Sequence, residues 1–183
     1  SIAPLEDCYS PNLFPGTNIA KEEFIQIGKW LIESGVDILL LETMNSISET
    51  NACLDAISTY KLPIWVSFVL KDDKHILSGE KLVDAIEVLS DYNIDTLLIN
   101  CNPLDRTESA LSIISKNWNK RWGIYPNLGI GEPSPNGDIK EIHSDEEFLY
   151  TCKKAINLGA TIIGGCCGTN PNHIKNLKEL ENL

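Results

Sequence analysis

Apolar residues gather in five short runs rich in β-branched side chains, and the stretches between them space apolar residues as helices do. Because the runs are continuously apolar rather than alternating, they are typical of parallel strands covered on both faces. The predicted strands are Val36–Leu41, Ile64–Val69, Thr96–Ile99, Trp122–Tyr125 and Ala160–Ile163.

A helical pattern precedes the first strand and follows every strand. Three helices are expected to open at a capping box, because Ser46 and Glu49, Asp105 and Glu108, and Ser144 and Glu147 have its spacing. The predicted helices are Glu22–Ser34, a segment starting at Ser46, Lys81–Tyr92, Asp105–Asn117, Ser144–Leu158 and Pro171–Leu180.

The repeat of about 30 residues has the size of a strand–helix unit. It leaves two α/β architectures open, a doubly wound sheet and part of a (β/α)8 barrel, of which this chain would lack about three units. No glycine-rich phosphate-binding motif follows any strand, which is evidence against a nucleotide-binding doubly wound sheet. The longest loop, residues 129–143, has a length that is often functional.

Residues able to bind ligands follow several of the predicted strands. In a barrel these strand ends would lie on one rim, where active sites form. The residues are Glu42 and Thr43 after the first strand, Asn100 and Cys101 after the third, Asn127 after the fourth, and Cys166 and Cys167 after the fifth.

The six cysteines indicate metal binding rather than disulfides, because a chain of 183 residues that is 43% hydrophobic needs no such staples and two cysteines are adjacent. This favours a reducing, cytoplasmic compartment. Zinc prefers thiolates, and Cys101, Cys166 and Cys167 would leave one coordination position open for a substrate. Nearby glycines (Gly164, Gly165 and Gly168) would supply the bend that adjacent ligands need.

The remaining candidates have simpler interpretations. Cys53 and Cys152 fall within helical segments and are expected to be core thiols. The three histidines, which fall in loops or at a helix start, are expected at the surface: His75, His143 and His173. Glu42 ends a fully apolar strand, where it would either hold a substrate ammonium group or face water and cap a backbone donor.

Charge narrows the possible partners. Lys and Arg total 15 against 26 Asp and Glu, a net charge of -11 that repels nucleic acids and anionic membranes. No apolar run approaches the length of a membrane span, and no signal peptide is recognisable. Nucleic acids and membranes are therefore not expected as partners.

The segment Gly164-Gly-Cys-Cys-Gly-Thr-Asn-Pro-Asn-His-Ile174 resembles the signature of the zinc-dependent homocysteine S-methyltransferase family. Asn100-Cys101 resembles the upstream cysteine motif of that family, and Leu41-Glu42-Thr43 and Tyr125-Pro126-Asn127 resemble two further segments. Ser1-Ile2-Ala3-Pro4 resembles the end of its third strand.

The resemblance implies a (β/α)8 barrel of which residues 1–183 form the C-terminal portion, strands 4 to 8, with the N-terminal strands missing. It implies zinc on Cys101, Cys166 and Cys167, and Glu42 on the amino group of homocysteine. Thr43, Asn100 and Asn127 would also line the substrate site. The Asp-Gly-rich segment of the family's first strand is absent from this chain, and the loop from Ile130 to His143 does not match the expected subgroup forms.

The implied reaction is zinc-dependent methyl transfer to the thiolate of L-homocysteine, which forms methionine. S-methylmethionine, S-adenosylmethionine and betaine all remain possible donors, whereas methylated folate would need further domains. The alternatives are a non-catalytic or degenerate zinc-binding barrel fragment, and a doubly wound α/β binding protein with structural cysteines. Because the chain starts at Ser1 and five strands cannot close a barrel, we expect a piece of a longer protein that self-associates through exposed sheet edges.

Overall fold

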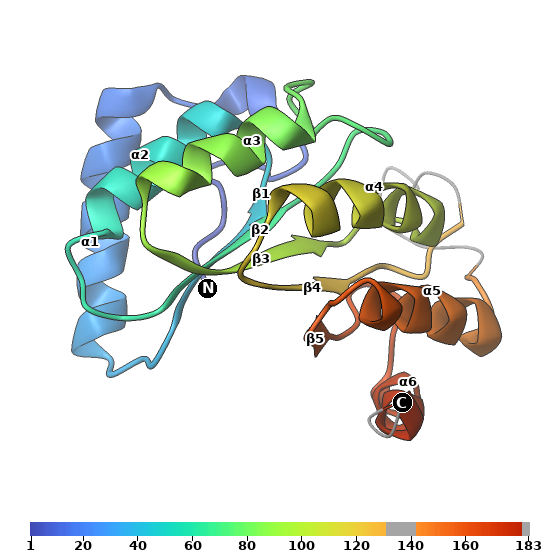
Figure 1. Ribbon diagram of the computed structural model, residues 1–183. Helices are drawn as coiled ribbons and strands as arrows, with labels where there is room; N and C mark the ends of the chain where they lie inside the picture. The colour runs from blue at the N-terminus through green and yellow to red at the C-terminus, as the bar shows by residue number, and fades with distance from the viewer. Residues whose placement is uncertain (131–141, 181–183) are drawn as a thin grey trace.

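Five parallel strands form one sheet in the order β1-β2-β3-β4-β5, as the computed structural model shows for residues 1–130 and 142–180 (Figure 1). Every neighbouring pair is parallel and consecutive in the chain. The strands are β1 (Leu39–Met44), β2 (Ile64–Phe68), β3 (Ile94–Asn100), β4 (Arg121–Tyr125) and β5 (Ile162–Ile163).

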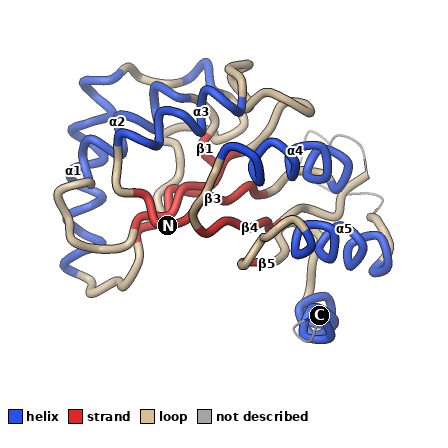
Figure 2. Tube along the Cα trace, viewed as in Figure 1, coloured by secondary structure: helices blue, strands red, loops and turns tan. Residues whose placement is uncertain are grey.

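Helices connect the strands, and successive helices contact each other, so they form one layer that follows the sheet (Figure 2). The α-helices are α1 (Thr17–Glu33), α2 (Ile47–Ile57), α3 (Leu82–Val88), α4 (Leu104–Asn117), α5 (Asp145–Asn157) and α6 (Pro171–Leu177). Three 3-10 turns accompany them, η1 (Pro11–Leu13), η2 (Leu89–Asp91) and η3 (Lys178–Leu180).

This topology argues against the doubly wound alternative. A doubly wound sheet reverses its strand order at a switch point and carries helices on both faces. The five described strands instead follow one another without a reversal, as the strands of a (β/α)8 barrel do. The α/β class predicted from the sequence is therefore confirmed, and barrel membership stays a prediction.

The first residues of the chain extend the sheet beyond β1. Ile2 forms a parallel bridge with Leu41. The Ile2 amide donates to the Leu40 carbonyl at 2.7 Å, and the Glu42 amide donates to the Ile2 carbonyl at 2.8 Å. The edge of β1, which was expected to be exposed, is thus covered at this one position.

Each predicted strand is present, with shifted ends. The first strand was expected over Val36–Leu41 but β1 continues through Glu42 to Met44, because Met44 pairs with Phe68 of β2. The last strand, expected from Ala160, is reduced to two residues that pair with Gly123 and Ile124 of β4. The ends of these strands depend on pairing with neighbouring strands, which the pattern of apolar residues does not predict.

The caps of the helices differ in how well they were predicted. The capping box of Ser144 and Glu147 is present at α5. At α2 the Ser46 hydroxyl accepts from the Glu49 amide, but the Glu49 carboxylate turns away to accept from the amide of Leu5 at 2.8 Å. The predicted box is therefore only half formed.

The predicted cap at Asp105 is wrong. The N-cap residue of α4 is Pro103, which offers no side-chain acceptor. The Glu108 carboxylate instead accepts from the Thr151 hydroxyl and the Lys154 ammonium of α5, each at 2.8 Å. A contact between two helices has replaced a local cap.

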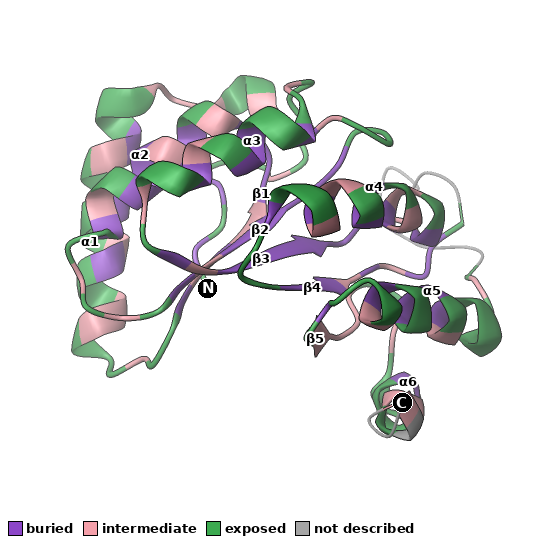
Figure 3. Cartoon of the chain, in the orientation of Figure 1, coloured by how far each residue is buried: buried purple, intermediate pink, exposed green. Residues whose placement is uncertain are grey.

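The core lies between the sheet and the helix layer, where buried residues line the strands and the inner helix faces (Figure 3). Cys53 and Cys152 are fully buried there, which confirms them as core thiols, and burial raises the pKa of Cys152 to about 12. No helix of residues 1–130 and 142–180 has the length and apolarity that crossing a bilayer requires.

The surface position predicted for His173 is wrong, because its side chain is 3% exposed. Its Nδ1 accepts from the Asn170 amide at 3.0 Å, and its Nε2 lies 3.2 Å from Asp145 of α5. Its ring packs against that of Phe148 at an interplanar angle of 88°. His173 thus fastens the start of α6 to α5, which the sequence pattern of a helix start does not reveal.

Candidate metal centre

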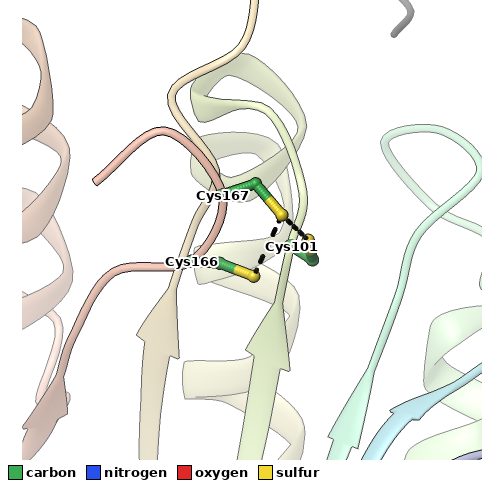
Figure 4. Close-up of side chains that lie close together, drawn as sticks. All are labelled: Cys101, Cys166 and Cys167. Atoms are coloured by element: carbon green, nitrogen blue, oxygen red, sulfur yellow. Dashed lines mark hydrogen bonds between the residues drawn. The ribbon is translucent and has the colours of Figure 1, made fainter. Parts of the chain in front are cut away.

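Three cysteine sulfurs meet at the carboxyl end of the sheet, where Cys101 follows β3 and Cys166 and Cys167 follow β5 (Figure 4). The Sγ atom of Cys167 lies 3.4 Å from that of Cys101 and 3.9 Å from that of Cys166. All three sulfurs lie within 4.8 Å of one another. Ligands on tetrahedral zinc with Zn–S bonds of about 2.3 Å are about 3.8 Å apart, so the donor set fits this metal.

The backbone around Cys101 turns its side chain toward the centre. Cys101 has a left-handed φ of 55°, which is uncommon for a residue with a β-carbon. Its amide donates to the Tyr125 carbonyl at 3.1 Å, and its own carbonyl accepts from Nδ2 of Asn127 at 3.1 Å. Both bonds tie the end of β3 to the segment after β4 and hold the strained conformation.

A tight turn presents the adjacent pair of cysteines. The Thr169 amide donates to the Cys166 carbonyl at 3.1 Å. Gly168, the third residue of this turn, has the positive φ of 80° that a type II turn requires there. A β-carbon at Gly165 would lie 2.5 Å from Cγ2 of Thr169, so this glycine permits close packing of the turn.

The turn is also anchored to the neighbouring strand segment. The Cys166 amide donates to the Pro126 carbonyl at 2.8 Å, and the Leu128 amide donates to the Cys167 carbonyl at 2.9 Å. Because the segment from Pro126 to Leu128 binds both sides, it fixes the distance between Cys101 and the pair.

Negative charge concentrates on one sulfur of the cluster. Hydrogen bonds from Cys166, Tyr9 and Cys167 outweigh burial and lower the pKa of the Cys101 thiol to about 5. The hydrogen bond to Cys101 raises the pKa of Cys166, and burial raises that of Cys167. A bound cation would displace thiol protons and stabilise all three thiolates.

A carboxylate and a phenol lie beside the sulfurs. Burial, with the adjoining Glu42 carboxylate, raises the pKa of the Tyr125 phenol although Ser67 opposes the shift. Cys166 contributes to the same rise, so Tyr125 lies near both Glu42 and Cys166. The Tyr125 hydroxyl is buried and has no hydrogen-bond partner among the described residues, which leaves a polar atom available to a ligand.

The other predicted substrate residues hold backbone segments together. Asn100 is 1% exposed; its Nδ2 donates to the Thr43 hydroxyl at 2.8 Å, and its Oδ1 accepts from the Ser67 hydroxyl at 2.6 Å. The Asn127 amide group contacts the Cys101 carbonyl and the Gly129 amide. Glu42 and Thr43 are half-buried at the end of β1.

Tyr9 is a residue of the centre that the sequence reasoning did not identify. Its hydroxyl donates to Sγ of Cys101 at 3.0 Å. No periodicity or motif marked it, since it lies in the loop before α1. The predicted functional loop, residues 129–143, is joined at its base by a bridge between Gly129 and Ile142, and residues 131–141 lie outside the described part of the chain.

Comparison with known proteins points to one family. The sequence model of the family described as homocysteine S-methyltransferase matches residues 1–180. Homocysteine S-methyltransferase YbgG of Bacillus subtilis is 30% identical over 165 residues, which cover 87% of this chain and 52% of that protein. Homocysteine S-methyltransferase 1 of Arabidopsis thaliana is 33% identical over 152 residues, 79% of this chain and 46% of that protein.

A solved structure agrees with these relatives. The metallated form of the homocysteine methyltransferase MmuM from Escherichia coli superposes with a TM-score of 0.80 at 26% identity, covering 97% of this chain and 56% of that chain. The chain thus spans about half the length of the relatives that it matches.

Proposed function

Because the chain belongs to the homocysteine S-methyltransferase family, we propose that it supplies the zinc-binding part of a barrel that methylates homocysteine to methionine. The observation that carries the proposal is the convergence of three sulfurs from two strand ends, at separations that suit a tetrahedral ion. The metallated form of MmuM, a protein of similar fold, supports a metal in this family.

Cys101, Cys166 and Cys167 would hold the ion and leave one position for the substrate sulfur. When bound there, zinc would favour the thiolate of homocysteine near neutral pH. That thiolate would attack the methyl carbon of the donor as the bond from carbon to the donor atom breaks and the electron pair leaves with the donor. The products are the thioether methionine and the demethylated donor.

Glu42 would hold the substrate by its ammonium group. Its carboxylate lies at the end of β1 next to the Tyr125 phenol, which lies near Cys166. A small amino acid could therefore place its ammonium at Glu42 and its sulfur at the cysteines. The free hydroxyl of Tyr125 would give a further polar contact.

Metal content tests the ligand set. Purified under reducing conditions, the chain is expected to hold about one zinc ion. Ser in place of Cys101, Cys166 or Cys167 should remove most of the metal. Cys53→Ser is the matched control, because Cys53 is buried in the core away from the cluster. Full zinc retention in all three ligand variants would refute the site.

Homocysteine binding to the zinc-loaded protein tests the role of Glu42. Glu42→Ala is expected to weaken binding by about 1.5–3 kcal/mol, the usual contribution of a charged hydrogen bond, while zinc content stays unchanged. Glu33→Ala, at the end of α1, is the control. Calorimetry with equal affinities for Glu42→Ala and the unaltered chain would exclude this role.

A further inference from the structure

Tyr9 is held over the metal centre by a structured turn. The Asp7 carboxylate accepts from the Tyr9 amide at 3.0 Å and from the Ser10 hydroxyl at 2.7 Å. The carbonyl of Cys8 accepts from Nδ2 of Asn45, which follows β1, at 3.2 Å. These bonds fasten the loop both to itself and to the end of the sheet, so the position of the tyrosine is built into the fold.

The side chain of Tyr9 reaches from this turn to a buried sulfur. It is 51% exposed, whereas Cys101 is 7% exposed, and the hydroxyl donates to Sγ of Cys101 at 3.0 Å. A hydrogen bond to an anionic acceptor is stronger than one between neutral groups.

We propose that Tyr9 is a positioning residue that donates a hydrogen bond to the Cys101 thiolate in the metal-bound protein, fixing this ligand and reducing the charge that it donates to the ion. The inference rests on the proposed function. Partners outside the ligand shell orient ligands and tune the ion. With less charge from Cys101, the ion would bind the incoming thiolate of homocysteine more strongly.

Cobalt substitution gives a readout of this bond that does not depend on activity. A hydrogen bond lowers the energy of the sulfur lone pairs, so removing it should shift the sulfur-to-cobalt charge-transfer band of the Co²⁺-loaded chain to longer wavelength. Tyr9→Phe is expected to produce that shift. Because Cys101 is no longer held in place, the variant should also bind zinc about tenfold more weakly in competition with a chelator, even though its sulfur donates more charge.

Tyr92→Phe is the matched control, because the Tyr92 hydroxyl donates to Asp55 at 2.6 Å and Tyr92 precedes β3, at the end of the sheet opposite to Cys101. Its spectrum and zinc affinity should equal those of the unaltered chain. Since Tyr9 is half exposed, Tyr9→Phe should remain folded in the metal-free state.

Three results would overturn the inference. An unchanged Co²⁺ spectrum and zinc affinity in Tyr9→Phe would refute the hydrogen bond while leaving the proposed function intact. Loss of a separate phenolate band would identify Tyr9 as a ligand instead. If the unaltered chain bound neither Co²⁺ nor zinc, the proposed function and this inference would fail together.

Discussion

Two residues with β-carbons, Thr43 and Cys101, adopt left-handed φ angles of 61° and 55° at the ends of β1 and β3. Such conformations cost about 1–3 kcal/mol each and persist where the surroundings enforce them. Asn100 does so at Thr43, since its Oδ1 accepts from the Thr43 amide and the Ser67 hydroxyl while its Nδ2 donates to the Thr43 hydroxyl. One amide group thereby joins the ends of three neighbouring strands.

Replacing this amide should relax the strained backbone at Thr43. Asn100→Ala is expected to lower the free energy of unfolding by about 3 kcal/mol, because it leaves buried donors of Ser67 and Thr43 unpaired. Denaturant titration measures the loss. Asn117→Ala is the control: it removes one exposed bond to Ile113 and should change stability by less than about 0.5 kcal/mol. Equal midpoints for the two variants would contradict this role.

The cluster of three cysteine sulfurs could be predicted from the sequence, whereas the residues that surround it could not. Adjacent cysteines among glycines have few uses other than metal binding, and topology places strand ends together. Tyr9 depends on a turn made by Asp7, and Tyr125 depends on the register that pairs it with Asn100. Patterns of residue type carry neither the direction of a loop side chain nor the register of a strand.

At the scale of elements, the start of α5 is defined by a carboxylate that titrates. Glu147 caps the helix, and hydrogen bonds from the Ser144 backbone, His143 and the Ser144 side chain lower its pKa below the ordinary value of 4.5. A group whose folded pKa is depressed contributes stability above its unfolded pKa and loses it as pH falls through the folded pKa. The cap should therefore weaken only in acid.

When the pH is lowered from neutral to below the ordinary pKa of glutamate, the free energy of unfolding should change less in Glu147→Gln than in the unaltered chain. The reason is that the variant carries no charge to lose. Unfolding curves collected as pH is lowered measure this difference, and Glu146→Gln, next to it on α5, serves as the control. A pH profile of Glu147→Gln that coincides with that of the unaltered chain would show that the cap has no such linkage.

Elements themselves were predicted better than their ends. The apolar runs located all five strands because those of β1 to β4 are largely buried, whereas the two residues of β5 are half-buried. Helix α2 illustrates the limit, since Glu80 accepts from the amide of Ile47 at its start, from 33 residues away along the chain. A long-range acceptor of this kind is invisible to a pattern that spans four residues.

For the whole molecule, the open sides of the sheet are the dominant feature. β1 is bridged on its outer side by Ile2, and β5 pairs with β4 alone among the described strands. Ile19 and Trp30 are more than half exposed and lie about three turns apart on one face of α1. Unpaired strand edges and exposed apolar side chains favour association.

We expect the 183-residue chain alone to self-associate. If the sheet is part of a (β/α)8 barrel, as we propose, a longer polypeptide with all eight strands should be monodisperse and have methyltransferase activity. Light scattering coupled to size exclusion measures the first property, and methionine formation the second. A fully active, monodisperse monomer of the 183 residues would show that the chain needs no further strands.

The position of the three sulfurs affects which part of the molecule unfolds locally. Cys101 and Cys167 are 66 residues apart, and β4 and α5 lie between them in the chain. An ion bound by both cysteines would close the segment between them into a ring. The residues within that segment would then unfold locally less often. Amide hydrogens of β5, which otherwise belong to a two-residue strand at the margin of the sheet, would then exchange with solvent more slowly. The exchange rate at Ile162 and Ile163 would serve as a gauge of metal occupancy.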